Sequence, residues 1–150
     1  MDRIDKAIIR ALQSEGRISM LKLSDKVGLS PTPCARRLKN LEDEGIISGY
    51  HAVVDEQKTG YGFSVFVSIK LDKQIDQALK VFEDAILRYP EVVNCWLMTG
   101  NRDYLMRLAV ADLSEFEYFL TSKLTKIEGI ASIESSIPIR QVKSDLSRKA

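Results

Sequence analysis

The sequence predicts the α+β fold class, with a helical domain over residues 1–54 and a sheet-containing domain over residues 63–150. Apolar residues recur at helical spacing up to about residue 54. From Phe63 onward they alternate, as in a half-buried strand, and the patterns that follow give the order strand, helix, strand, strand, helix, strand. Residues 55–62 between these parts carry charges with Gly60 and Gly62, which is typical of a linker.

The first two predicted helices have recognisable ends. Asp2 and Asp5 lie near the positive end of the first helix, and Gly16 ends it. Ser19 is the expected N-cap of a second, short helix that stops at Gly28. The apolar stripe of the first helix is formed by Ile4, Ile8, Ala11 and Leu12.

A third helix is predicted from Pro31 to Glu44. Ser30 precedes it as N-cap, and proline fits the first helical position because the N–H group it lacks has no partner within the helix. Ile46–Val54 is β-branched and apolar, which predicts an extended ribbon. Three helices followed by a ribbon form a winged helix-turn-helix pattern.

The face of the third helix opposite its apolar residues has a composition that suits DNA. Three basic residues and no acidic residue lie between Ser30 and Leu41. Arginine can bind guanine through two hydrogen bonds, asparagine can pair with adenine, and hydroxyls near a helix start can reach phosphate. The alternative is an ordinary solvated basic face. The predicted DNA-contacting residues are Ser30, Thr32, Pro33, Arg36, Arg37, Lys39 and Asn40.

The second domain has the order of a ferredoxin-like βαββαβ fold, an antiparallel sheet with its helices on one face. Strands are predicted over residues 63–71, 92–99, 104–110 and 130–139. The apolar stripes of the two helices are Ile75, Leu79, Phe82 and Ile86, and then Leu113, Phe116, Leu120, Leu124 and Ile127. Asp112 and Glu115 are expected to cap the second of these helices, and Gly129 ends it. The free face of so small a sheet favours a second subunit as its cover.

Composition excludes several classes of function. The chain of 150 residues is 45% hydrophobic and has 22 Lys and Arg against 21 Asp and Glu. No apolar run approaches the roughly 20 residues that span a bilayer, and the start lacks the apolar region of a secretory signal, so a cytoplasmic protein is expected. Cys34 and Cys95 lack C-x-x-C spacing and His51 is alone. We therefore expect no catalytic residues, no metal site and no cofactor.

Several short motifs of both domains resemble those of one known family. In the first domain these are Gly28–Cys34, Arg36–Leu38 and Leu41–Ile47, and in the second Pro90–Val92, Thr99–Tyr104 and Val142–Lys143. They are similar to the helix-turn-helix signature and the ligand-sensing RAM domain of the Lrp/AsnC (feast/famine) transcriptional regulators. The resemblance implies homodimers built through the RAM sheets, higher oligomers such as octameric rings or discs, binding to double-stranded DNA, and regulation by amino acids or related metabolites.

The resemblance also implies an effector site at the turn Gly100–Tyr104, where Asn101 replaces a carboxylate that is usual in the family. A neutral Asn101 and a cationic Arg102 favour an effector that bears a carboxylate, whereas Asp103 could bind its ammonium group. The alternative is an ordinary hairpin turn. The predicted effector-binding residues are Met98, Thr99, Gly100, Asn101, Arg102, Asp103, Tyr104, Ile133 and Ser135.

These observations predict a sequence-specific DNA-binding transcriptional regulator that responds to an amino acid or related small metabolite and is not an enzyme. One alternative is a regulatory subunit or enzyme of amino-acid metabolism with a ferredoxin-like domain, which would need a catalytic constellation that the sequence does not contain. Another is an RNA-binding module with Trp96 as a stacking platform. The strand Val92–Thr99 around that tryptophan contains no Lys or Arg, which disfavours this alternative.

Overall fold

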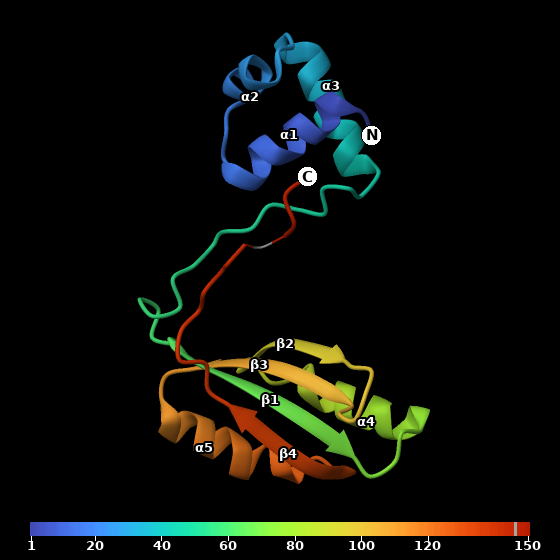
Figure 1. Ribbon diagram of the computed structural model, residues 1–150, viewed down its shortest axis with the longest axis vertical. Coiled ribbons are helices and arrows are strands. Elements are labelled where there is room, and N and C mark those ends of the chain that lie inside the picture. The colour runs from blue at the N-terminus through green and yellow to red at the C-terminus, as the bar shows by residue number, and fades with distance from the viewer. Residues whose placement is uncertain (146) are drawn as a thin grey trace. The chain divides into compact units, whose positions relative to one another are not determined.

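The computed structural model describes residues 1–145 and 147–150 and divides the chain into two units (Figure 1). Met1–Val53 and the described part of Lys143–Ala150 belong to the first unit, and Val54–Val142 form the second. The division falls beside the predicted boundary at residue 54. Hydrogen bonds from the first helix hold the described C-terminal residues in the first unit, although these residues belong to the predicted domain 63–150.

The first unit consists of three helices around a small apolar core. The helices are α1 (Arg3–Ser14), α2 (Met20–Val27) and α3 (Pro31–Asp43), counted over the described residues. Their bounds agree with the sequence patterns to within a residue or two. The buried side chains that hold them together are Ile8, Ala11, Leu23, Cys34 and Leu41.

Hydrogen-bonded caps and one glycine fix the ends of the first two helices. The Asp2 carboxylate accepts the N–H groups of Ile4 and Asp5 at 2.8 and 2.9 Å. Gly28 follows α2 with a φ of 72°, a left-handed conformation that strains other side chains. These local features produce the tight turn that directs the chain from α2 into α3.

The segment Ile46–Val54 differs from its prediction. We expected a ribbon, but in the described part of the chain this segment pairs with no strand. A ribbon needs a second extended run beside the first, and this short segment does not fold back on itself. It is instead attached to the end of α3, where the Tyr50 hydroxyl donates to the Glu42 carboxylate at 2.7 Å.

The second unit has the predicted ferredoxin-like sheet. Among the described residues, the strands are β1 (Phe63–Leu71), β2 (Val92–Leu97), β3 (Tyr104–Val110) and β4 (Ile130–Ser136). Their order is β2-β3-β1-β4, and each neighbouring pair is antiparallel. Alternate residues of β1 and β3 share one core with α4 (Asp76–Ile86) and α5 (Leu113–Ser122), so these helices cover the same face of the sheet.

The last helix of the second unit is shorter and less regular than the sequence predicts. The predicted helix from Asp112 to Gly129 divides into α5 and a 3-10 turn, Leu124–Lys126. Its stripe is also displaced, because Leu113 is 58% exposed whereas Phe119 is fully buried. Asp112 caps the helix at the Glu115 N–H, as predicted, and this leaves Leu113 at the helix end, away from the core.

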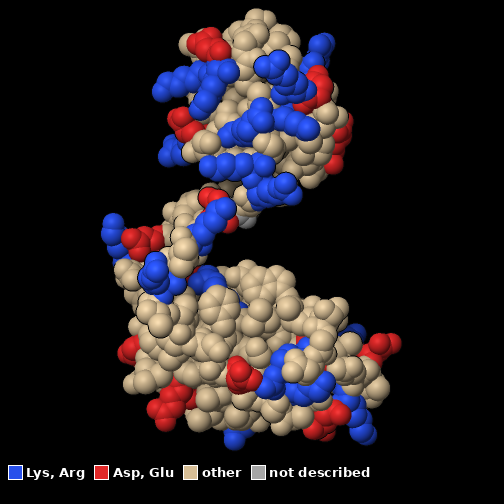
Figure 2. Space-filling model, in the orientation of Figure 1, with Lys and Arg blue, Asp and Glu red and all other residues tan. Residues whose placement is uncertain are grey.

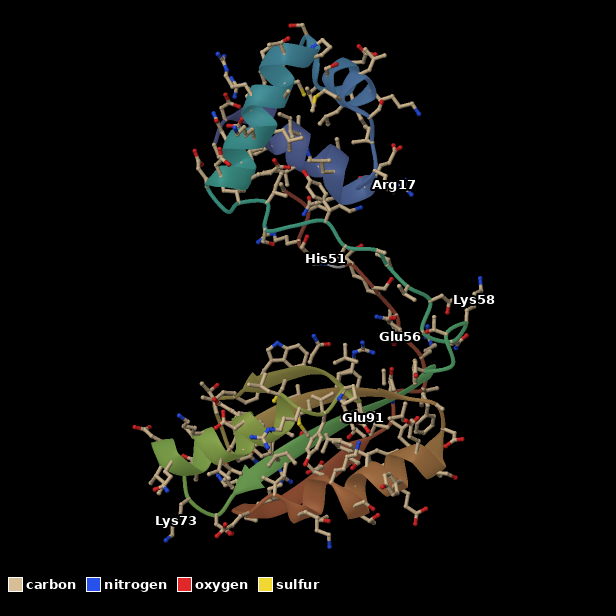
Figure 3. The ribbon with its side chains drawn as sticks, turned by 180° about the vertical axis from the view of Figure 1, so that it is seen from behind. Arg17, His51, Glu56, Lys58, Lys73 and Glu91 are labelled. Carbon is tan, nitrogen blue, oxygen red and sulfur yellow. The ribbon has the colours of Figure 1, made fainter. Side chains whose placement is uncertain are left out.

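The predicted linker, residues 55–62, forms a turn held against the sheet. Arg107 on β3 donates to both carboxylate oxygens of Glu56, at 3.0 and 2.8 Å. Figure 3 labels Glu56 on the segment that leads into β1. The Arg107 guanidinium lowers the pKa of the Glu56 carboxyl. No helix in the described part of the chain is both long and apolar enough to cross a membrane.

Candidate DNA-binding and effector sites

Helix α3 presents one face to the core and the other to solvent. Cys34 and Leu41 are buried against α1 and α2, as predicted. Burial raises the pKa of the Cys34 thiol, which keeps it protonated and unreactive. The exposed face of α3 carries Thr32, Arg36, Lys39 and Asn40.

The start of α3 leaves polar groups free to bind a ligand. Ser30 is the N-cap in an extended conformation, and within the described residues its hydroxyl makes no capping hydrogen bond. Pro31 and Pro33, which is half-buried, have no N–H to donate. The hydroxyls of Ser30 and Thr32 therefore stand at the positive end of a helix, where an anion is stabilised.

Arg36 and Arg37 are adjacent in sequence but differ in their surroundings. Arg37 donates to Asp2 at 2.6 Å and to Asp5 at 2.8 Å, so it ties α3 to the first turn of α1. The N–H of Asp5 and the Arg37 guanidinium lower the pKa of the Asp2 carboxyl to about 2. Arg36 and Lys39 form no ion pair with any described residue. The charges of Arg36 and Lys39 thus remain free for a partner.

The turn between β2 and β3 is built around Gly100, which has a φ of 104°. The N–H of Met98 donates to the carbonyl of Asp103 at 2.8 Å, and the N–H of Asp103 donates to Ile69 of β1 at 2.8 Å. Thr99, Gly100 and Asn101 are exposed at its tip. The tip therefore presents backbone groups to solvent on a fixed base.

The Asp103 carboxylate is not free to bind an ammonium group, in contrast to the prediction from the sequence. Its side chain is almost fully buried, and its Oδ2 accepts the N–H of Leu71 at 2.7 Å. Oδ1 accepts from the Gln74 amide, and the Lys70 ammonium lies 3.8 Å away. These contacts attach the turn to the end of β1, so the carboxylate positions the turn and is occupied by the protein itself.

Tyr104 fastens the other end of the turn to the helix layer. It is 1% exposed, and its ring centroid lies 4.4 Å from that of Phe82 on α4. Its hydroxyl donates to Glu83 at 2.7 Å. Burial, with Glu83 beside it, raises the pKa of Tyr104. This residue is part of the core and does not present a surface to a ligand.

The remaining predicted effector residues divide between the two faces of the sheet. Arg102 donates to Ser132 on β4 at 2.8 Å and forms an ion pair with Glu134. Ile133 and Ser135 lie between and beside these partners on the same strand, so they project from the opposite face. Arg102 therefore lies beside the exposed turn, whereas Ile133 and Ser135 lie on the other face of the sheet.

Sequence reasoning missed the residues that contact the predicted ones. They are Asp2 and Asp5 for Arg37, Lys70 and Gln74 for Asp103, Glu83 for Tyr104, and Ser132 and Glu134 for Arg102. A charged Glu134 in an otherwise apolar and hydroxylic strand was the one available signal. Among the described residues, no group of His, Cys, Asp and Glu side chains is arranged to hold a metal ion.

Both units match known family models. Residues 1–48 match a winged helix-turn-helix DNA-binding model, and residues 64–147 match the Lrp/AsnC ligand binding domain. The chain is 46% identical to the Bkd operon transcriptional regulator of Pseudomonas aeruginosa, over 95% of this chain and 93% of that protein. It is 36% identical to the leucine-responsive regulatory protein of Escherichia coli, over 95% and 87% of the two chains.

Solved structures agree with the arrangement of the elements. A transcriptional regulator of Neisseria meningitidis in complex with L-methionine superposes with a TM-score of 0.94 at 32% identity, covering 99% of this chain and 96% of that one. An AsnC family transcriptional regulator from Agrobacterium tumefaciens gives a TM-score of 0.93 at 36% identity, with the same coverage. The fold of the whole chain is therefore shared with these regulators.

The first prediction separates the two neighbouring arginines. Arg37→Ala removes a partly exposed ion pair between α3 and the first turn of α1, so it should slightly lower the melting temperature measured by thermal denaturation. Arg36→Ala should leave the stability unchanged and weaken binding to duplex DNA by about 1–3 kcal/mol if Arg36 binds a guanine. Reversed effects of the two variants would contradict this assignment.

The second prediction tests the buried carboxylate of the turn. Asp103→Ala leaves the Leu71 N–H without an acceptor and should destabilise the sheet unit by about 1–3 kcal/mol. Fluorescence of Trp96, the one tryptophan of the chain, reports unfolding of this unit. Asn101→Ala, at the exposed tip of the same turn, should stay within about 0.5 kcal/mol. Equal stability of the two variants would show that Asp103 is dispensable for the turn.

Proposed function

Because this chain belongs to the Lrp/AsnC family of transcriptional regulators, we propose that it binds duplex DNA through the exposed face of α3 and binds its effector beside the turn at Gly100. The observation that carries the proposal is the unpaired charge of Arg36 and Lys39 on a helix whose other face is buried. Major-groove contact requires this arrangement, since the helix must be fixed by its core and open on its polar side.

The proposed DNA contacts have different tasks. Arg36 and Asn40 lie on the exposed face of α3, where their planar groups can read base edges. Ser30, Thr32 and Lys39 are suited to phosphate. Arg37 is assigned to positioning, because its guanidinium is already bound by Asp2 and Asp5.

The proposed effector is an amino acid or a close metabolite. The Neisseria regulator is a complex with L-methionine, and the leucine-responsive relatives carry an amino acid in their name. In this chain an effector carboxylate can bind the exposed N–H groups at Gly100 and Asn101, and the Arg102 guanidinium can join them by exchanging its ion pair with Glu134 for the effector carboxylate. Since the Asp103 carboxylate is occupied, we assign the effector's ammonium group to backbone carbonyls.

Relatives named as transcriptional regulators favour a regulator without catalytic activity over the enzyme alternative. Binding to double-stranded DNA also distinguishes it from an RNA-binding module. A protein that regulates genes must reach the DNA, which supports the expected cytoplasmic location.

We propose that the sheet face opposite the helices is the dimer interface. Phe66, Trp96 and Leu105 lie on this face, because they alternate with the residues of β1, β2 and β3 that point to the core, and Trp96 is 46% exposed. Aromatic and aliphatic side chains left exposed on a flat sheet favour pairing with an identical face. Further association of such dimers would give the octameric assemblies expected for the family.

The third prediction tests this assembly. Light scattering of the full chain at micromolar concentration should show a dimer or a higher oligomer. Leu105→Glu places a charge on the proposed interface and should shift the protein toward monomers. Tyr118→Glu is the matched control, since Tyr118 is 62% exposed on α5, away from that face. A monomeric wild type, or equal effects of both variants, would contradict the proposed interface.

The fourth prediction tests the effector site. A thermal-shift screen of amino acids, with L-methionine and L-leucine included, should find a ligand that stabilises the protein by about 2.7 kcal/mol at a hundredfold excess over its Kd. Arg102→Ala should reduce this shift and leave DNA affinity without effector unchanged. Lys73→Ala, an exposed loop residue labelled in Figure 3, should retain the shift. A screen without any stabilising amino acid at millimolar concentration would contradict the sensing function.

A further inference from the structure

The near-neutral chain separates into a positive and a negative unit. Residues 1–53 and 143–150 contain 12 Lys and Arg against 8 Asp and Glu, whereas residues 54–142 contain 10 against 13. Figure 2 shows Lys and Arg side chains crowded on the viewed face of the first unit. Half of the positive excess of the first unit comes from its C-terminal segment, where Lys143, Arg148 and Lys149 outnumber Asp145.

The end of this segment is held on α1 through its backbone (Figure 1). The Gln13 amide donates to the carbonyl of Arg148 at 2.9 Å and accepts the N–H of Ala150 at 3.0 Å. The same amide group also donates to the Ser147 hydroxyl at 2.8 Å, and Arg10 donates to the carbonyl of Ala150 at 3.3 Å. A glutamine that bonds to a peptide in this way leaves the basic side chains of the peptide unused.

The side chains of Arg148 and Lys149 are exposed and charged. Within the described residues, neither of them lies within 4.0 Å of a carboxylate oxygen, whereas Lys143 is 3.2 Å from Asp145. Two free cationic groups are therefore fixed by their backbone on the surface of the unit that contains α3.

Anchoring of the segment does not explain these charges. Arg10, which donates to the oxygen of Ala150, is itself cationic, and the unit already has a positive excess without its last residues. Like charges repel, so neutral side chains at positions 148 and 149 would hold at least as well. The positive charges of Arg148 and Lys149 become favourable when a polyanion binds to the first unit.

We propose that residues 147–150 form an accessory DNA-binding arm, in which Arg148 and Lys149 contact the phosphate backbone of duplex DNA while Gln13 holds the arm on α1. The inference rests on the DNA-binding function proposed above and adds a second contact region to α3. We assign Arg148 and Lys149 to phosphate and not to base edges, because they lie outside α3, the helix proposed to enter the major groove. The arm therefore adds affinity equally for all duplexes.

The test compares three full-length proteins by their affinity for duplex DNA between about 50 and 200 mM salt. The variant Arg148→Gln with Lys149→Gln removes two charges from the arm. The variant Lys73→Gln with Lys80→Gln removes two exposed charges from the other unit and is the matched control. A duplex selected by the wild-type protein from a random pool and an unselected duplex of equal length are measured for each protein.

The arm variant should weaken binding to both duplexes by the same factor. Its slope of log affinity against log salt should fall by about 0.9 for each lost phosphate contact, so the wild type should lose roughly tenfold more affinity than the variant over this salt range for two lost contacts. The control variant should retain the wild-type slope. Gln13→Met, which keeps all charges but cannot hold the arm, should show part of the affinity loss.

Three outcomes would overturn the proposal. If the arm variant has the same slope of log affinity against log salt as the wild type, the arm does not contact DNA. If Arg36→Ala still weakens binding in a sequence-dependent way, the DNA-binding function of α3 stands without the arm. If the arm and control variants lose the same affinity for DNA, the loss reflects the overall charge of the protein and not a contact made by the arm. Failure of the wild type to bind any duplex would overturn both the arm and the proposed function.

Discussion

Alternating burial along β1 and β3 constrains the whole second unit. Val67 and Ile69 of β1 face the helices and pair with Met106 and Tyr104 of β3, and all four are at most 1% exposed. A slip of one residue would move every buried side chain to the other face, so this register is strongly fixed. The register also brings the N–H group of Leu71, at the end of β1, to the Asp103 carboxylate. The buried carboxylate is tolerated there because this N–H group and the Gln74 amide donate to it.

The sequence predicts what local periodicity determines. The bounds of β1 and β3 agree with their patterns, since alternation of apolar residues directly reports which face is buried. Caps at Asp2 and Ser19 are equally local, because each involves residues within one helical turn. The segment Ile46–Val54 has an extended composition, but a ribbon depends on a partner strand that composition does not provide. Pairing is thus the part of the fold that a local pattern could not predict.

The candidate sites show the same limit. Composition places arginines on α3, yet Arg36 is free and Arg37 is bound by Asp2, a residue 35 positions away. Asp103 has the chemistry of an ammonium ligand, but Leu71 and Gln74 already occupy it from 32 and 29 positions away. In each case the side chain has the chemistry that the ligand needs. Whether it is free to bind depends on a partner that is distant in the sequence. The tertiary hydrogen bonds, together with the motif, therefore determine which residues can bind a ligand.

In salt solution, electrostatic interactions extend over a shorter distance than the size of a folded domain. At physiological ionic strength the Debye length is about 8 Å, less than the radius of about 13 Å typical of a domain of 100 residues. A phosphate near α3 therefore interacts mainly with charges within about 8 Å of it, whatever the net charge of the chain. The net charge of +1 is the sum of a positive unit and a negative unit. A near-neutral chain can thus present a basic surface to DNA.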